Sequence, residues 1–355
     1  MLGLFKSKSF LGIDIGASTV KIVALGRKGK VRNLENYGEM SVAFGQNDDN
    51  KSDFFIGLEI ASQAISYICD EARIKTREAS FSIPDFYTFF TNLKIPYINK
   101  KDISEAIKYE IRPYIPLPLS ELTLDWVVIS NGKANKGDIE ILAAAIPNDV
   151  IHQYQEIARI SRLKLRFLEP EAFALARSIY WSGFKGVVGL IDIGARSTTC
   201  NVLEDGILKM SYSFRVAGNE LTERLARSLN MDYNKAEEIK IKYGILEGNH
   251  SGANNGSYDA KKILSLSLDL IAEEMKKVLR NFYQDKGKEA DKIIITGGTA
   301  WMPGLREYFS GILGKEIVIL NPFNNIEHPQ VLKAILEKKG PFYAIATGLA
   351  LRGLE

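Results

Sequence analysis

Two short segments of the chain share the sequence Asp-Ile-Gly-Ala and lie about half the chain length apart, at 14–17 and 192–195. Each copy follows an apolar run typical of a buried strand, and small hydroxyl residues and a second strand-like run come after it. Four matching residues can arise by chance. A match in the same local context at half-chain spacing indicates a duplicated α/β domain.

The residue types in these two turns suit the binding of a nucleotide phosphate. Gly16 and Gly194 leave the backbone bare, so we expect their N–H groups to reach phosphate oxygens. Asp14 and Asp192 end the preceding strands, where they can hold the water shell of Mg²⁺, an ion that takes few carboxylates. Lys21, on the next strand, is expected to reach the β-phosphate. The other predicted contributors are Ala17, Ser18 and Thr19 in the first turn and Ala195, Ser197 and Thr198 in the second.

One Asp-x-Gly turn alone is equally typical of an ordinary hairpin, so the prediction depends on further features. The segment Ile293–Ala300 is a buried strand that runs into Gly297, Gly298 and Thr299. We expect these glycines to let the α-phosphate and the base of a nucleotide pass close to the backbone. The sequence therefore predicts a nucleotide site built from both halves of the chain.

The composition limits the classes of protein to consider. The 355 residues are 46% hydrophobic and 25% charged with a formal net charge of +3, which is ordinary for a globular chain of two domains. Basic residues come singly or in pairs, so nothing indicates nucleic-acid binding. The first residues lack the apolar h-region of a signal peptide and no apolar run reaches ~18 residues, so neither a signal peptide nor a membrane span is expected. Cys69 and Cys200 lie in apolar runs, as expected for buried thiols. A cytoplasmic protein is expected.

Hydrophobic periodicity predicts the elements that position these residues. Strands are expected at Phe10–Ile13, Val20–Leu25, Ala79–Ile83, Thr88–Ile95, Leu122–Ile129, Glu140–Ile146, Val187–Ile191, Cys200–Leu203 and Lys292–Thr296. Helices are expected at Asp53–Arg73, Asp102–Tyr109, Asn148–Ser161, Asn219–Leu229, Lys235–Tyr243, Lys261–Tyr283 and Phe342–Leu351, with Asn148 as the cap of its helix. The polar stretch Asn249–Ser257 is expected to be a mobile loop.

The order of the motifs resembles the actin/Hsp70/FtsA superfamily of ATPases. The matching segments are GIDIGASTVK at 12–21, EPEAFALA at 169–176, LIDIGARSTTCNV at 190–202, IIITGGTAWMPGL at 293–305 and AIATGLALR at 344–352. The resemblance implies an α/β, actin-like (ribonuclease H-like) duplicated fold that binds ATP and Mg²⁺ between two lobes. It implies Glu169 as the catalytic carboxylate that orients a water, and leaves the rate of hydrolysis open. It also implies nucleotide contacts from Gly218, Asn219, Glu237 and Lys240.

A compact insert within the first half carries a finer resemblance. YEIRPYIPLPLSELTLDW at 109–126, followed by LAAAIPNDVI and LKLRFLEPEAFALAR, resembles the type IV pilus assembly family PilM, an FtsA-like branch with an SHS2-like subdomain called 1C. The resemblance implies a cytoplasmic component that docks the N-terminal cytoplasmic peptide of an inner-membrane PilN-type protein in a groove beside 1C. It meets the membrane only through that partner, and contacts with pilus motor ATPases and self-association stay open. Tyr109, Arg112, Tyr114 and Ile115 are the candidate peptide contacts, with core packing as their other interpretation.

These matches divide the chain into four parts. Residues 1–84, 169–186 and 328–355 are assigned to the first lobe (1A), 85–168 to the 1C insert, 187–220 and 293–327 to the second lobe (2A), and 221–292 to subdomain 2B.

Two alternatives stay open at this point. A filament-forming, FtsA-like cell-division protein is disfavoured because the chain ends directly after its last motif, where FtsA continues into a membrane-binding helix. A small-molecule kinase of the same superfamily would need a base, for which Asn148-Asp149 is the candidate, although such a pair is typical of an ordinary helix start.

Overall fold

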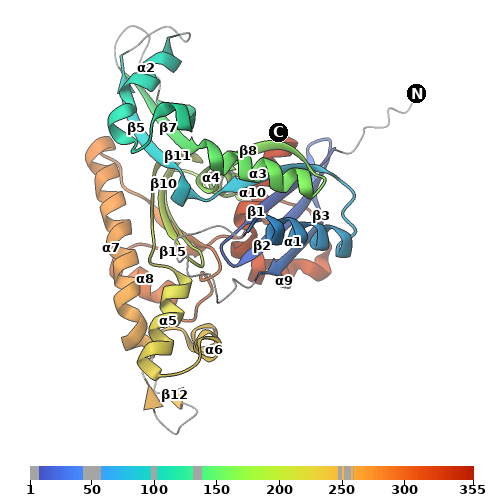
Figure 1. The fold of residues 1–355 in the computed structure, drawn as a ribbon. Coiled ribbons are helices and arrows are strands. Elements are labelled where there is room, and N and C mark those ends of the chain that lie inside the picture. Colours follow the sequence, from blue (N-terminus) through green and yellow to red (C-terminus); the bar gives the residue numbers. More distant parts are fainter. Residues whose placement is uncertain are drawn as a thin grey trace.

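The computed structural model describes residues 8–42, 57–96, 102–130, 138–246, 250–251, 257–258 and 260–355. Two lobes, each built on a five-stranded sheet, lie side by side, and a third, smaller sheet lies above them in Figure 1. The first residues of the predicted helix at Asp53–Arg73 and much of the predicted loop at Asn249–Ser257 lie outside the described residues.

The sheet of the first lobe consists of β1 (Lys8–Ile15), β2 (Thr19–Lys28), β3 (Val31–Ser41), β4 (Glu78–Ile83) and β8 (Lys164–Pro170). Its order is β3-β2-β1-β4-β8, with the first three strands antiparallel and β4 and β8 parallel to β1.

The sheet of the second lobe repeats this plan. It consists of β9 (Val187–Ile193), β10 (Thr198–Glu204), β11 (Ile207–Phe214), β14 (Lys292–Thr296) and β15 (Ile317–Ile319). The order is β11-β10-β9-β14-β15, again an antiparallel hairpin set followed by two parallel strands. The duplication predicted from the repeated motif is confirmed, because each motif lies at the turn of the corresponding hairpin.

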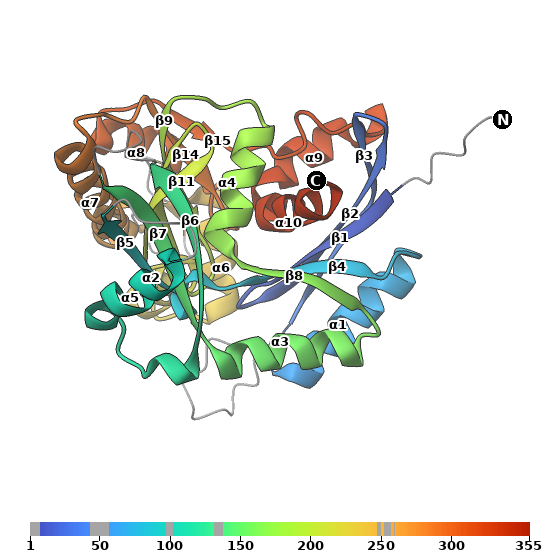
Figure 2. The ribbon, with the colours of Figure 1, turned by 90° about the horizontal axis from the view of Figure 1, so that it is seen from above.

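Helices cover both faces of the first sheet. On one face α1 (Leu58–Glu71) packs beside α3 (Asn148–Ile160), and on the other α4 (Glu171–Trp181) packs against α10 (Ala344–Leu354), as Figure 2 shows. The short α9 (Lys333–Lys339) precedes α10.

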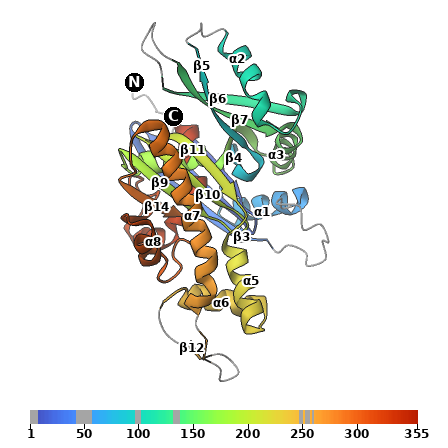
Figure 3. The same ribbon diagram turned by 90° about the vertical axis from the view of Figure 1, so that its left-hand side faces the viewer.

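In the second lobe the long α7 (Ala260–Lys286) runs along the sheet (Figure 3). It packs against α5 (Gly218–Leu229) and α8 (Leu305–Leu313), and α6 (Tyr233–Tyr243) packs on α5. Because α5 begins at Gly218, the predicted boundary between 2A and 2B at residue 220 falls inside a helix. Within the predicted loop, β12 (His250–Ser251) and β13 (Ser257–Tyr258) pair as a short antiparallel ladder.

The insert is smaller than predicted. Its antiparallel sheet has the order β5-β7-β6, from β5 (Phe89–Ile95), β6 (Leu122–Ser130) and β7 (Ile139–Pro147), and α2 (Ile103–Glu110) packs on it. The predicted end at residue 168 is wrong. Helix α3 places Val150 and Tyr154 in the core of the first lobe, and β8 pairs with β4, so the insert ends with β7.

Although the insert belongs to the first half of the sequence, polar contacts tie it to the second lobe. Lys94 Nζ lies 2.7 Å from Asp285 Oδ1, and Lys286 pairs with Glu140. Buried Lys209 on β11 donates from Nζ to the Ile129 carbonyl at 2.8 Å. The insert therefore spans both lobes, and a change in the angle between the lobes has to displace it from one of them.

Helix α10 lies so close to its neighbours that only small residues fit. An ideal Cβ built on Gly348 would lie 1.9 Å from the Ala174 carbonyl oxygen of α4, and one on Gly12 of β1 would lie 1.8 Å from the Ala346 carbonyl oxygen. These approaches bring α4, α10 and β1 together behind the first Asp-Ile-Gly-Ala turn.

We predict that Gly348→Ala destabilises the protein by ~3 kcal/mol or more, because backbone rather than a flexible side chain blocks the added methyl group. Gly311→Ala is the matched control. Gly311 lies in α8 with open space at its Cβ position, so alanine should add roughly 0.5–1 kcal/mol through its better helix propensity. Urea unfolding measures both, and equal midpoints for Gly348→Ala and wild type would contradict the close packing.

Candidate functional site

The two Asp-Ile-Gly-Ala segments form matching hairpin turns. The Gly16 N–H donates to the Thr19 carbonyl at 3.1 Å, and the Gly194 N–H donates to the Ser197 carbonyl at 3.0 Å. The prediction that these glycine amides are free for phosphate is wrong, because each closes its own turn. Backbone contacts to a phosphate have to come from the N–H groups that follow each glycine.

The turns lie on opposite sides of a cleft of about 470 Å³ between the lobes. The residues predicted to contact a nucleotide come together here, with two exceptions. The cleft is lined by Asp14, Gly16, Ala17, Ser18, Thr19 and Lys21 of the first lobe and by Asp192, Gly194, Ala195, Ser197, Gly218, Asn219, Glu237, Lys240, Gly297, Gly298 and Thr299 of the second. Thr198 and Glu169 do not line it.

Thr198 is fully buried, and its hydroxyl donates to the Val216 carbonyl at 2.7 Å. The two turns are closed by equivalent bonds, so the position of Ser18 in the first turn is taken by Arg196 in the second. Thr198, which was predicted to contact the nucleotide, lies beyond the turn. The Thr198 bond supports the segment before Gly218, whose N–H donates back to the second turn at 3.0 Å. Thr198 thus buttresses the turn from behind.

Glu169 faces away from the cleft. Its carboxylate accepts two hydrogen bonds from Arg177, at 2.5 and 3.1 Å, and Arg177 also donates to the Gly348 carbonyl. This bidentate pair ties β8 to α4 and α10. The predicted role of Glu169 as the carboxylate that orients a water does not fit this geometry. Glu171, two residues further along the same motif, lines the cleft instead.

Lys21 is the cation around which the buried carboxyl groups of the cleft gather. Its Nζ lies 2.8 Å from Asp14 Oδ2, and the Ser82 hydroxyl donates to the other Asp14 oxygen at 3.1 Å. Burial lowers the pKa of Lys21, but Asp14, Asp192 and Glu171 together outweigh it, so the pKa is raised and the ammonium stays charged.

Asp192 lies opposite Asp14, at the end of β9. Burial raises the pKa of its carboxyl to about 7, with Lys21 opposing the rise and Asp14 adding to it. Gly297 lies directly against Asp192 and has a φ of +92°, a backbone angle that favours glycine. No side chain fits at this position, because a Cβ would lie 2.6 Å from Asp192 Oδ1. The glycine of the third motif therefore makes room for the second aspartate.

Two further buried carboxyl groups cap each other's helical turns in the wall of the cleft. Glu171 begins α4, and its Oε2 accepts a bond from the N–H of Asp85, the first residue of the single-turn helix Asp85–Tyr87, at 3.1 Å. In return Asp85 Oδ1 accepts the Ala172 N–H at 3.1 Å. Burial raises the pKa of Asp85 to about 7 and that of Glu171 well above its usual value. Sequence reasoning missed this pair.

The lining also includes large side chains that the sequence did not single out, among them Ile241, Trp301 and Phe342. Trp301 is half-exposed, and the Phe342 ring centroid lies 4.4 Å from Lys21 Nζ. Trp301 lies in the glycine-containing motif at 293–305, so its position carried a signal. Phe342 lies just before α10, and only the fold brings it to the cleft.

Lys240 and Glu237 line the cleft on the side of the second lobe. Lys240 Nζ donates to the Gly218 carbonyl at 3.0 Å and to the Thr222 hydroxyl at 2.8 Å, and Glu237 lies 2.6 Å from it. Burial lowers the pKa of Lys240, with Glu237 opposing. The three partners fix the ammonium beneath Gly218 at the rim of the second turn.

Within the described ranges, no three His, Cys, Asp or Glu side chains are grouped so as to hold a metal ion by themselves. Mg²⁺ needs fewer protein ligands, because it retains several waters. Asp14, Asp192 and Glu171 place more negative charge around Lys21 than it balances, which suits an added divalent cation.

In the part of the chain that the structure describes, no helix has both the length and the apolar character needed to cross a membrane.

Asn148 and Asp149, the pair considered for a kinase base, lie outside the cleft lining. The Asn148 side chain accepts the Thr123 hydroxyl at 2.8 Å and donates to the Ser120 carbonyl at 3.0 Å, and Asp149 Oδ1 accepts its neighbour's N–H. Helix α3 begins at Asn148 itself, after Pro147, so the prediction of Asn148 as its cap is also wrong. Neither side chain is placed to act on a nucleotide.

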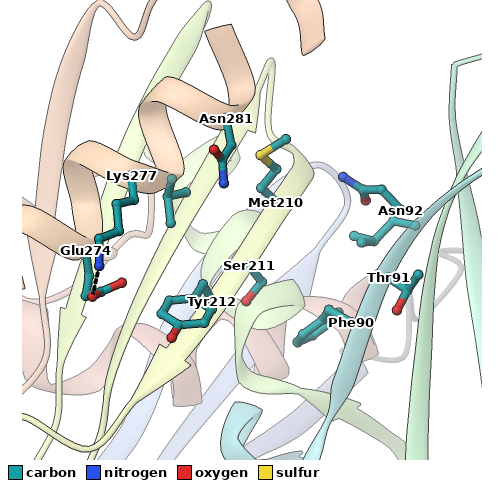
Figure 4. A pocket seen from close by; sticks show the side chains of 11 residues that line it. Phe90, Thr91, Asn92, Met210, Ser211, Tyr212, Glu274, Lys277 and Asn281 are labelled. Atoms are coloured by element: carbon teal, nitrogen blue, oxygen red, sulfur yellow. Dashed lines mark hydrogen bonds and ion pairs between the residues drawn. The ribbon is translucent and has the colours of Figure 1, made fainter. Parts of the chain in front are cut away.

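A second hollow, of about 430 Å³, lies between the insert and the second lobe (Figure 4). One wall comes from β5 and the other from β11, each an edge strand of its sheet, and α7 closes one side. A smaller hollow of about 240 Å³ shares Phe90, Ser211 and Tyr212 with it. We call the two together the β5–β11 groove. Its lining is Asp85, Phe86, Thr88–Asn92, Tyr114, Leu142, Met210–Ser213, Glu274, Lys277, Val278 and Asn281.

The four predicted peptide contacts do not form one site. Tyr114 lines the smaller end of the β5–β11 groove, whereas Arg112 and Ile115 line a separate surface hollow with Leu117. Tyr109 is 72% exposed and lines neither.

The duplicated sheets, the paired turns and the cleft between the lobes define an actin-like protein of the two-lobed ATPase fold. The family model described as "Type IV pilus assembly protein PilM" matches residues 12–354. The chain therefore belongs to the PilM family of type IV pilus assembly proteins.

The chain is also similar to individual proteins. The cell division protein FtsA of Enterococcus hirae is 23% identical over 356 residues, covering 89% of this chain and 79% of FtsA. The structure described as "PilM-PilN type IV pilus biogenesis complex" has a TM-score of 0.83 at 24% identity and covers 97% of this chain and 98% of its own. MreB5 of Spiroplasma citri bound to ADP has a TM-score of 0.51 at 12% identity over 93% of this chain and 98% of its own. At these identities the structures show the fold alone.

Asp85 gives the unliganded protein a testable pH dependence. Between about pH 4 and the raised pKa of about 7, the folded protein keeps a proton on Asp85 that the unfolded chain releases. The stability from this proton is lost as the pH rises through about 7. Burial and the neighbouring acidic groups Asp192 and Glu171 raise the pKa of Asp85 and favour its protonated form, whereas the Ala172 N–H, which donates to Asp85, opposes the rise.

We therefore expect Asp85→Asn, which is neutral at every pH, to gain in melting temperature relative to wild type between about pH 5.5 and pH 8.5. The amide oxygen can still accept the Ala172 N–H, so the helix start is kept. Thermal melts without nucleotide measure the difference, and a difference that does not change with pH would contradict the buried, protonated carboxyl.

Proposed function

We propose that this chain is a nucleotide-dependent adaptor in the inner-membrane assembly platform of a type IV pilus. It binds Mg·ATP in the cleft between the lobes and docks the N-terminal cytoplasmic peptide of a PilN-type membrane protein in the β5–β11 groove. This partner holds it at the cytoplasmic face of the membrane. The observation that carries the proposal is that, in a chain of the PilM family, both hollows lie across the same two lobes.

The chemistry of the cleft supports the nucleotide. Lys21, Ser18 and the amides of both turns lie at the end where the two aspartates meet, which suits the phosphates. Trp301 and Ile241 offer apolar surface for the base, and Gly298 leaves the backbone open beside Phe342. Bound Mg²⁺ would supply positive charge against the phosphates, with Asp14, Asp192 and Glu171 as the residues that hold it or its waters.

The same residues favour a binding role over rapid turnover. Glu171 is the carboxyl placed to orient a water at the cleft, but burial holds its pKa well above the usual value, and a protonated carboxyl is a weak base. The protein then uses ATP chiefly as a ligand that sets the angle between the lobes.

The architecture of the groove supports an extended peptide. β5 and β11 are each the edge strand of their sheet, and a sheet edge is where an extended peptide can add as a further strand. Phe90, Leu142, Met210 and Val278 make the lining apolar, and the Glu274–Lys277 pair lies at one end (Figure 4). A short peptide with apolar side chains fits this combination.

Coupling between the two sites follows from geometry. The first lobe supplies one wall of the cleft and, through its insert, one wall of the groove, while the second lobe supplies the opposite walls. A nucleotide that changes the angle between the lobes therefore changes the groove. Coupling of this kind is typically worth about 1–3 kcal/mol.

Nucleotide binding is tested with Asp192→Ala. Loss of this carboxylate should weaken the affinity for Mg·ATP at least ~10-fold, or about 1.4 kcal/mol in binding free energy. Calorimetry measures the affinity, with Trp301 fluorescence as a second readout. Glu78→Gln, at the far end of β4 on the surface, is the control and should bind as wild type does. Unchanged affinity in Asp192→Ala would remove the aspartate from the site.

Peptide docking is tested with Tyr212→Glu, which puts a charge into the groove at a half-exposed position. We expect it to weaken binding of a synthetic N-terminal PilN-type peptide at least ~10-fold by fluorescence anisotropy. Tyr283→Glu is the matched control, because Tyr283 is similarly exposed on α7 but does not line the groove. If both variants bind as wild type does, the peptide docks elsewhere, and the Arg112–Ile115 hollow becomes the next candidate.

A further inference from the structure

The wall between the nucleotide cleft and the β5–β11 groove is one pair of side chains thick. Glu171 lines the cleft, and Asp85 lines the smaller end of the groove. The two residues are 86 positions apart in the chain yet bond directly to each other's helical turns. The two sites are therefore in contact through this pair, in addition to sharing the lobes.

One hydrogen bond joins each of the two side chains to the helical turn of the other. The Glu171 carboxylate secures the Asp85 N–H, and the Asp85 carboxyl secures the Ala172 N–H at the start of α4. The second oxygen of Asp85, Oδ2, is buried and has no hydrogen-bond partner among the described residues. A buried polar atom without a partner makes the arrangement less stable than a fully bonded one, so a ligand can shift it at low cost.

A displacement of Asp85 would reach the groove through the residues next to it in the chain. Phe86 lines the groove, and the Arg215 guanidinium lies 5.0 Å from the centroid of its ring. Arg215 precedes Val216, whose carbonyl accepts the Thr198 hydroxyl behind the second turn. The turn Asp85–Tyr87 is thus flanked by Glu171 on the nucleotide side and by a segment leading to the other phosphate turn.

We propose that the Asp85–Glu171 pair is the positioning element that couples the two sites. A ligand in the cleft that draws the Glu171 side chain toward it weakens the bond to the Asp85 N–H and releases the turn Asp85–Tyr87 at the end of the groove. This inference rests on the proposed function, in which the cleft takes a nucleotide and the groove a peptide.

Hydrogen exchange tests the link without the peptide. On saturation of the wild-type protein with the non-hydrolysable analogue Mg·AMPPNP, the amide of Asp85 should exchange about fivefold faster, the change expected for loss of one hydrogen bond. Saturating analogue that leaves this amide unchanged would overturn the inference and leave nucleotide binding intact. Failure of the analogue to bind would overturn the proposed function itself.

The peptide experiment uses three variants. In wild type, the affinity for the synthetic PilN-type peptide should differ at least about fivefold with and without Mg·AMPPNP. Asp85→Ala, which removes the bond that holds the turn Asp85–Tyr87 to the start of α4, should lower this ratio, while Asp85→Asn, which keeps an acceptor, should restore it. Asp205→Ala is the stability control, because it removes a similar bond, to the Gly186 N–H, at a turn that lines neither site. An unchanged ratio in Asp85→Ala, or an equal loss in Asp205→Ala, would show that the pair is structural only.

Discussion

The arrangement of the two lobes depends on the charged side chains that are buried where the two Asp-Ile-Gly-Ala turns face each other. Asp14, Asp192 and Glu171 all act on the Lys21 ammonium, and one cation cannot balance three carboxylates away from water. Burial therefore raises the pKa of Asp192 to about 7 and that of Glu171 well above its usual value. On the function proposed above, a metal–phosphate ligand relieves this imbalance, because the metal adds positive charge among the carboxyls and the phosphates face Lys21 and the amides. The cleft is thus suited to a nucleotide with its metal rather than to a free anion.

The features that sequence reasoning predicted correctly are those that local chemistry determines. The repeated Asp-Ile-Gly-Ala turns, the strands that lead into them and the Gly297-Gly298 turn all depend on neighbouring residues, and their half-chain spacing implied the duplication. Features that depend on contacts between distant segments of the chain were not predicted. Glu169 and Glu171 lie in one motif, but Glu169 pairs with Arg177, which also bonds to Gly348 of the distant α10, while Glu171 lines the cleft. Asp85 and Phe342 reach the functional regions from segments without a recognised motif.

The boundary of the insert was misjudged for the same reason. A helix and a strand at 148–168 follow directly after the insert strands in sequence, and nothing local distinguishes them. Their partners, α1 and β4, lie far back in the chain and draw them into the first lobe. The insert that is left is a small sheet whose contacts through Lys94, Lys209 and Lys286 reach the other lobe. In this chain the added subdomain consequently contacts both lobes and is not an appendage of one of them.

The β5–β11 groove draws its walls from the insert, from β11 and from α7, segments that emerge at very different times during synthesis. No fragment that ends before α7 can present it, and a chain in which the lobes are folded but not yet docked lacks one of its walls. On the function proposed above, a partner that recognises this groove selects completed molecules, so recruitment to the assembly platform would also be a checkpoint on folding.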